Sequence, residues 1–267
     1  MKIFNFSVFV LYLFVLILMV SCASSSGPKE DFYQEGINAK TQGDNVAAKK
    51  YLDKSCKSKN MDACVALAYM EKGSGNTKEA ITLYKKACDA NDLRACNTMA
   101  LLEDELGNTD TAATVLSDAC EKGYALACDN FGFMEEQRKR ALIALRSYKR
   151  ACELGLVSGC SNFAKMILRD GRKAEASKLF KYACSKDEYV SCYAAGDLEE
   201  KKGNIKLAKE FYTKACDNEG KMGCHALGIM AKNNRNYKTA RKYLNISCKN
   251  QIDDSCLVLE QLTKIGK

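Results

Sequence analysis

Fourteen of the fifteen cysteines in this 267-residue chain lie on a lattice of fixed spacing. They form seven pairs: seven residues separate the two members of each pair, and each pair begins 32 residues after the previous one. A fixed period of this length is typical of solenoids, in which one supersecondary unit stacks on the next. The pairs are Cys56/Cys64, Cys88/Cys96, Cys120/Cys128, Cys152/Cys160, Cys184/Cys192, Cys216/Cys224 and Cys248/Cys256.

Two further rows of residues keep the same period before each pair. An alanine stands eight residues before every first cysteine, and a large apolar residue stands four before it. Because positions i, i+4 and i+8 share one face of an α-helix, this pattern predicts a helix, here named helix B. The rows are Ala48, Ala80, Ala112, Ala144, Ala176, Ala208 and Ala240, and Leu52, Tyr84, Leu116, Tyr148, Phe180, Tyr212 and Leu244.

A second helix, helix A, follows each pair and carries a small residue four positions after the second cysteine. Gly-Asn or Gly-Asp often separates it from the next helix B, as at Gly75-Asn76. Glycine is typical of the end of a helix, and Asn or Asp is a typical N-cap of the next one. The chain has one Pro, so it has few of the turn-forming residues that an all-β sandwich needs. We therefore expect an all-α solenoid over residues 30–267, built of seven αα-hairpins and a C-terminal capping helix. The small row is Ala68, Ala100, Gly132, Ala164, Gly196 and Gly228, with Gly36 before the first pair.

The ends of the array distinguish two possible disulfide pairings. If each helix A cysteine bonded the helix B cysteine of its own hairpin, Cys56 and Cys256 would have no partner. If each pair bonded internally, all fourteen would be satisfied, so we expect seven local disulfides. The last helix A has Glu260 at the small position, which predicts a polar capping face.

The N-terminus explains the fifteenth cysteine. Residues 3–20 are almost unbroken hydrophobe after Lys2, which is typical of a secretory signal or an uncleaved membrane anchor. Met19-Val20-Ser21-Cys22 resembles a bacterial lipobox, although Met19 replaces the usual leucine. We expect a lipoprotein signal peptide over 1–21, lipidation of Cys22 and a flexible tether over 22–29. Ala23 rather than Asp follows Cys22, which in enterobacterial-type sorting favours the outer membrane, on its periplasmic or surface side.

The helix B pattern GN-x3-A-x3-Y-x2-AC, followed by AC-x2-LA, resembles the tetratricopeptide and Sel1-like repeat superfamily. The C-x7-C in each unit makes the chain similar to exported cysteine-rich Sel1-like proteins such as the Helicobacter cysteine-rich family. The period of 32 is a few residues shorter than is usual in Sel1-like units. The resemblance implies a superhelix whose concave groove, lined by helices A, binds a protein or peptide. For some relatives it also implies penicillin binding with weak β-lactamase activity.

The groove positions implied by the resemblance vary along the array. They are the residue after each helix A cysteine and the residue four further on, the latter including Leu101 and Phe133. Variation on the inner face of an otherwise uniform scaffold indicates binding of a specific partner. The alternative is neutral variation at exposed sites. Our candidate groove residues are Asn97, Asp129, Tyr193 and His225.

Catalysis has little support in the sequence. The one S-x-x-K stretch, Ser26 to Lys29, lies in the tether, and neither S-D-N nor K-T-G occurs. With one histidine and cysteines expected in disulfides, we expect no catalytic residue, metal or cofactor.

The fourth hairpin has Arg138, Lys139 and Arg140 in place of the Gly-Asn turn, a local basic patch or a solvated face. We therefore expect an exported, lipid-anchored, monomeric interaction scaffold at a bacterial envelope that does not bind nucleic acid. A β-lactamase-like protein is the alternative.

Overall fold

The computed structural model describes residues 31–217 and 220–264. The expected signal peptide, Cys22 and the tether lie outside these residues. Within them the chain forms fifteen α-helices and no strand, which confirms the all-α solenoid of hairpins. None of the described helices is both long enough and apolar enough to cross a membrane.

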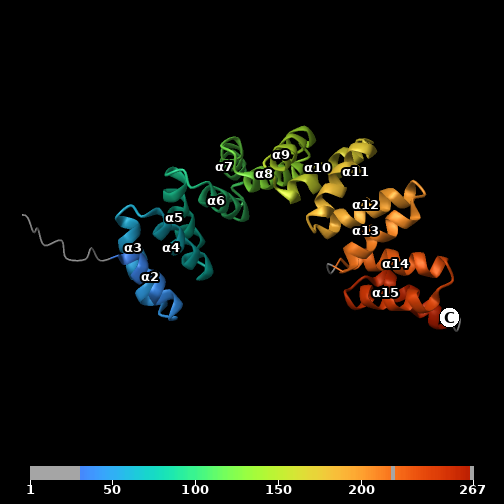
Figure 1. Cartoon of the computed structure of the whole chain (residues 1–267). Helices are drawn as coiled ribbons and strands as arrows, with labels where there is room; N and C mark the ends of the chain where they lie inside the picture. Colours follow the sequence, from blue (N-terminus) through green and yellow to red (C-terminus); the bar gives the residue numbers. More distant parts are fainter. Residues whose placement is uncertain (1–30, 218–219, 265–267) are drawn as a thin grey trace, which may run out of the picture. The chain divides into compact units, whose positions relative to one another are not determined.

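The chain divides into two compact units, Met1–Met70 and Glu71–Lys267, and the boundary falls within α4. Helices A and B alternate along the chain, and in the second unit α5 to α16 follow one another as helix pairs (Figure 1). The helices A are α2 (Phe32–Thr41), α4 (Met61–Gly73), α6 (Leu93–Glu105), α8 (Ala125–Gln137), α10 (Val157–Arg169), α12 (Tyr189–Lys201), α14 (Lys221–Asn233) and α16 (Asp253–Lys264). The helices B are α3 (Asn45–Lys57), α5 (Thr77–Asp89), α7 (Thr109–Glu121), α9 (Ala141–Glu153), α11 (Lys173–Ser185), α13 (Ile205–Asp217) and α15 (Tyr237–Lys249).

The turns repeat every 16 residues, which is half the period of the cysteines. A left-handed residue ends each helix whose turn is described, and the next backbone N–H bonds back into the last turn, as Asn108 N does to Glu103 O at 2.9 Å. Glycine adopts this conformation without steric cost, but six of the thirteen positions carry another residue. They are Gly43, Lys59, Gly75, Asn91, Gly107, Gly123, Lys139, Gly155, Gly171, Asp187, Gly203, Arg235 and Gln251.

Helix A meets helix B of the same hairpin through the small residue of the lattice. The alanines eight residues before each first cysteine are completely buried. Gly132 on α8 faces the ring of Tyr148 on α9, where an added Cβ would lie 2.8 Å from Cδ1. Gly196 faces Tyr212 in the same way, at 2.7 Å. A large side chain on helix B therefore requires a small one on helix A.

Among the residues that the structure describes, seven disulfides join the last turn of each helix B to the first turn of the next helix A. This is the local pairing expected from the sequence. So many structural disulfides indicate folding in an oxidising compartment outside the cytosol. The bonds join Cys56 to Cys64, Cys88 to Cys96, Cys120 to Cys128, Cys152 to Cys160, Cys184 to Cys192, Cys216 to Cys224 and Cys248 to Cys256.

The second cysteine of each of the first six pairs is buried between the helices, at no more than 2% exposure. These six cysteines are therefore part of the core, and they do not belong to a site that a ligand or a partner could contact. In the last pair, by contrast, the second cysteine, Cys256, is partly exposed, and no helix B follows α16 among the described residues. The six buried positions are Cys64, Cys96, Cys128, Cys160, Cys192 and Cys224.

Substitution of Gly132 by alanine tests the close helix crossing. Because the new Cβ would overlap Tyr148, we expect Gly132→Ala to lower the free energy of unfolding by about 1–3 kcal/mol. Gly73→Ala is the matched control, since a Cβ there meets nothing within 4 Å. Guanidinium unfolding followed by circular dichroism measures both variants. Equal stability of the two would contradict the packing account.

Candidate binding face on the A helices

Polar side chains link successive helices A of the second unit. Asn97 on α6 is buried, and its Oδ1 accepts a hydrogen bond from Nδ2 of Asn130 on α8 at 2.8 Å. Asp129 on α8 accepts bonds from Asn162 Nδ2 and Ser158 Oγ on α10, both at 2.9 Å. Each of these bonds joins one repeat to the next on the same face of the array.

The same arrangement continues along the face, and we call the whole set the polar ladder. Ser191 Oγ on α12 donates to Ser161 Oγ on α10 at 2.9 Å. Near the C-terminus, Nδ1 of His225 on α14 lies 2.7 Å from Ser255 Oγ on α16. The ladder also includes the ion pair between Glu136 on α8 and Arg169 on α10. The members of the polar ladder are Asn97, Asp129, Asn130, Glu136, Ser158, Ser161, Asn162, Arg169, Ser191, His225 and Ser255.

Tyr193 belongs to a different environment from the other three candidate groove residues. Its ring packs against Tyr212 on helix B of its own hairpin, with 5.7 Å between the ring centroids. Burial raises the pKa of the Tyr193 phenol above its ordinary value. Among the described residues, none of the four candidates hydrogen-bonds to another, so the structure spreads them along the face instead of gathering them into one site.

In the second unit, the residues five positions after each second cysteine of α6 to α14 range from exposed to half-buried, and Ile229 on α14 packs against the core. Phe133 on α8 is 59% exposed, and Leu101 on α6 is 37% exposed. Further along, Lys165 on α10 is 3.3 Å from Asn162, and Asp197 on α12 pairs with Lys201 at 2.6 Å. We name this set, Leu101, Phe133, Lys165, Asp197 and Ile229, the A-face row; it is apolar at α6 and α8 and charged at α10 and α12.

Glutamates near the ends of the helices A fix the turns beside this face, and the sequence analysis did not identify them. The side-chain amides of Asn76, Asn108 and Asn204 donate to Oε2 of the glutamates five residues earlier, Glu71, Glu103 and Glu199, at 2.6–2.7 Å. Hydrogen bonds from Lys181, Asn204 and Lys202 hold the pKa of Glu199 at about 2. The recurring E-x4-N spacing was the signal available in the sequence.

One hydroxyl on this face lies beside the chain's single histidine. His225 and Ser255 are in contact, but Ser255 is completely buried, so a substrate cannot reach its hydroxyl. In the same part of the chain, no group of three or more His, Cys, Asp or Glu side chains could hold a metal ion. The chemistry available on this face is recognition by hydrogen bonds, charges and apolar contacts.

Comparisons with known proteins agree with the hairpin fold. The tetratricopeptide repeat family model matches residues 62–92 and 189–221. No curated protein sequence matches the chain. Two stretches of the chain are therefore similar to tetratricopeptide repeats, and its cysteine pairs fit a cysteine-rich repeat protein.

Three solved structures share the fold at low identity. A protective antigen of uropathogenic Escherichia coli strains, which displays an SLR fold, aligns with a TM-score of 0.74 and 18% identity over 88% of this chain. The chain spans only 56% of that antigen. A Sel1 repeat protein from Oxalobacter formigenes aligns with a TM-score of 0.65 and 20% identity, covering 82% of this chain and 97% of that one. PilF of Pseudomonas aeruginosa aligns with a TM-score of 0.61 and 19% identity, covering 79% of this chain and 99% of that one.

The partly buried His225, which contacts Ser255, predicts that the stability of the fold depends on pH. Burial lowers the pKa of His225, and nearby Asp254 opposes this effect only in part. A histidine whose pKa is lower in the folded state than in the unfolded state stabilises the fold above the unfolded pKa of about 6.5, and this stability is lost as the pH falls. We expect the thermal midpoint to fall between pH 7.5 and pH 5 by more in the parent protein than in His225→Gln. An identical fall in both proteins would show that this histidine does not contribute.

Proposed function

We propose that this chain is an exported scaffold, lipid-anchored at Cys22, that binds a protein or peptide at a bacterial envelope. The binding surface is the face that carries the A-face row and the polar ladder, here called the A face. The chain acts as a monomer, and its anchor holds it at the outer membrane. Its repeats are of a kind that typically binds protein partners. We also propose that the chain is related to the Helicobacter cysteine-rich family.

The exposure of Phe133 and Leu101 is the observation that carries the binding role. Apolar side chains exposed on successive helices A leave apolar surface in water that a protein partner can bury. The polar ladder supports this assignment, because its bonds satisfy the neighbouring polar groups within the scaffold. Phe133 and Leu101 are then the side chains on this stretch of the face with apolar surface to bury.

The disulfides support export, and the lipobox-like residues 19–22 support the anchor. Seven bonds of this kind do not persist in a reducing cytosol. An N-terminal lipid anchor would leave the repeat array in the aqueous space beside the membrane. A β-lactamase role has no comparable support, since the sequence carries the S-x-x-K stretch only in the tether, and no group of three or more His, Cys, Asp or Glu among the described residues could hold a metal ion.

Site-specific photocrosslinking in the native cell tests the A face directly. A photoreactive amino acid replaces Phe133 or Leu101 in the whole chain, and adducts are identified by mass spectrometry. We expect one protein to be captured at both positions. Leu142 on α9 is the matched control, because it is 72% exposed and apolar but lies on a helix B. Equal capture of that protein at Leu142, or no adduct at either A-face position, would overturn the assignment.

A further inference from the structure

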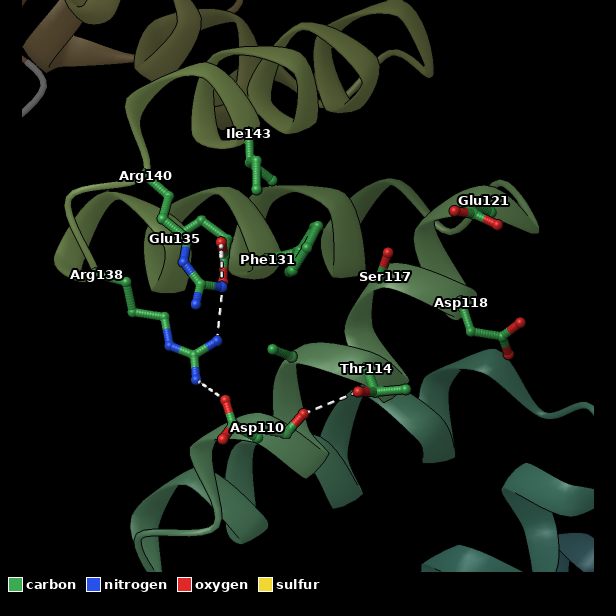
Figure 2. A pocket seen from close by; sticks show the side chains of 11 residues that line it. Asp110, Thr114, Ser117, Asp118, Glu121, Phe131, Glu135, Arg138, Arg140 and Ile143 are labelled. Atoms are coloured by element: carbon green, nitrogen blue, oxygen red, sulfur yellow. Dashed lines mark hydrogen bonds and ion pairs between the residues drawn. The ribbon is translucent and has the colours of Figure 1, made fainter.

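A pocket of about 480 Å³ opens between α7 and α9, with side chains of α8 between them (Figure 2). This volume lies within the range of 300–1,000 Å³ that is usual for ligand pockets. Its lining comes from α7, one side of α8, the turn that follows α8 and the start of α9. The turn is the one in which Arg138, Lys139 and Arg140 replace the usual Gly-Asn. The pocket therefore lies where the fourth hairpin departs from the repeat pattern.

At one end of the pocket the charges cancel. Glu135 is 1% exposed, and its carboxylate accepts bonds from Arg138 Nη1 at 3.1 Å and from Arg140 Nη1 at 3.3 Å. Arg138 also pairs with Asp110 on α7. Two guanidinium groups thus meet two carboxylates, and the arginines of this turn are not a free basic patch. A buried carboxylate held by two arginines makes this end of the pocket rigid.

At the other end of the pocket the negative charges of the carboxylates are less neutralised by nearby cations. Asp118 and Glu121 extend from α7 away from the arginine cluster (Figure 2). Asp118 pairs with the exposed Lys122 at 2.8 Å, which lies outside the lining. The lining carries four carboxylates and two arginines, so its formal charge is −2, whereas the whole chain carries +8. The ring of Phe131 lies between the two ends (Figure 2).

From this arrangement we infer that the pocket receives a lysine or arginine side chain of a partner polypeptide. The apolar stem of that side chain lies against Phe131, and its charge meets Asp118 and Glu121. The charge gains ionic attraction from the two carboxylates, and the stem buries apolar surface against the ring. Because the protein as a whole repels cations, a basic segment is attracted to this pocket by local charges and not by the overall field.

This site is distinct from the A-face row. Phe131 and Phe133 are two residues apart on α8, so at about 100° per residue their side chains leave the helix about 200° apart. The pocket therefore faces away from the A-face row, and a failure of one site leaves the other untouched. The inference goes beyond the proposed function by adding a second contact surface with its own partner chemistry.

Fluorescence anisotropy with a labelled peptide tests the pocket. The probe is an octapeptide of alternating lysine and alanine, added to the whole oxidised chain purified in detergent. The same peptide with every lysine acetylated is the uncharged comparison. We expect the charged peptide alone to bind, and Glu121→Gln to raise its Kd about fivefold, the upper range for a solvent-exposed ion pair.

Glu153→Gln is the matched control for this variant. Glu153 occupies the same lattice position on α9, directly after the first cysteine of its pair, and it lies outside the pocket. Its replacement should leave the Kd unchanged. Equal binding of the acetylated peptide, equal effects of the two glutamate variants, or no binding of the charged peptide would each overturn the inference.

Discussion

The disulfide between each helix B and the next helix A provides the link that a single αα-hairpin cannot make for itself. A hairpin of 32 residues buries too little apolar surface to fold alone, so it depends on its neighbours. A bond that closes a loop of about nine residues stabilises the fold by roughly 2–3 kcal/mol on the loop-entropy account. The bond also fixes where one hairpin meets the next, and the contacts of the A face depend on that register.

Much of this architecture could be predicted from the sequence because its causes repeat. The cysteine pairs, the alanines of helix B and the small residue of helix A, such as Gly132 or Ala164, occupy the same place in every hairpin, and steric exclusion leaves few alternatives there. The 16-residue spacing of the turns was harder to recognise. A left-handed turn tolerates residues other than glycine, so Lys59 and Arg235 hide the pattern. Glu135 was missed for a related reason, since only the fold brings Arg138 and Arg140 to its carboxylate.

Variation among the candidate groove residues has a structural cause that the sequence could not provide. Asn97, Asp129 and His225 each contact a polar side chain on the next helix A. Because these side chains are already hydrogen-bonded within the scaffold, variation there does not by itself indicate a partner. The stronger indications of binding are the exposed Phe133 and the charged pocket beside α8, where no such neighbour accounts for the residue types.

Disulfide mapping of the protein purified from its native membrane tests the central claim most directly. Trypsin digestion without reduction, followed by mass spectrometry, identifies which cysteine is bonded to which. The account predicts seven bonds, each between the two members of one C-x7-C pair, such as Cys120 with Cys128, and no free thiol among the fourteen. Bonds within a hairpin, such as Cys64 with Cys88, or reduced cysteines in the isolated protein, would contradict it.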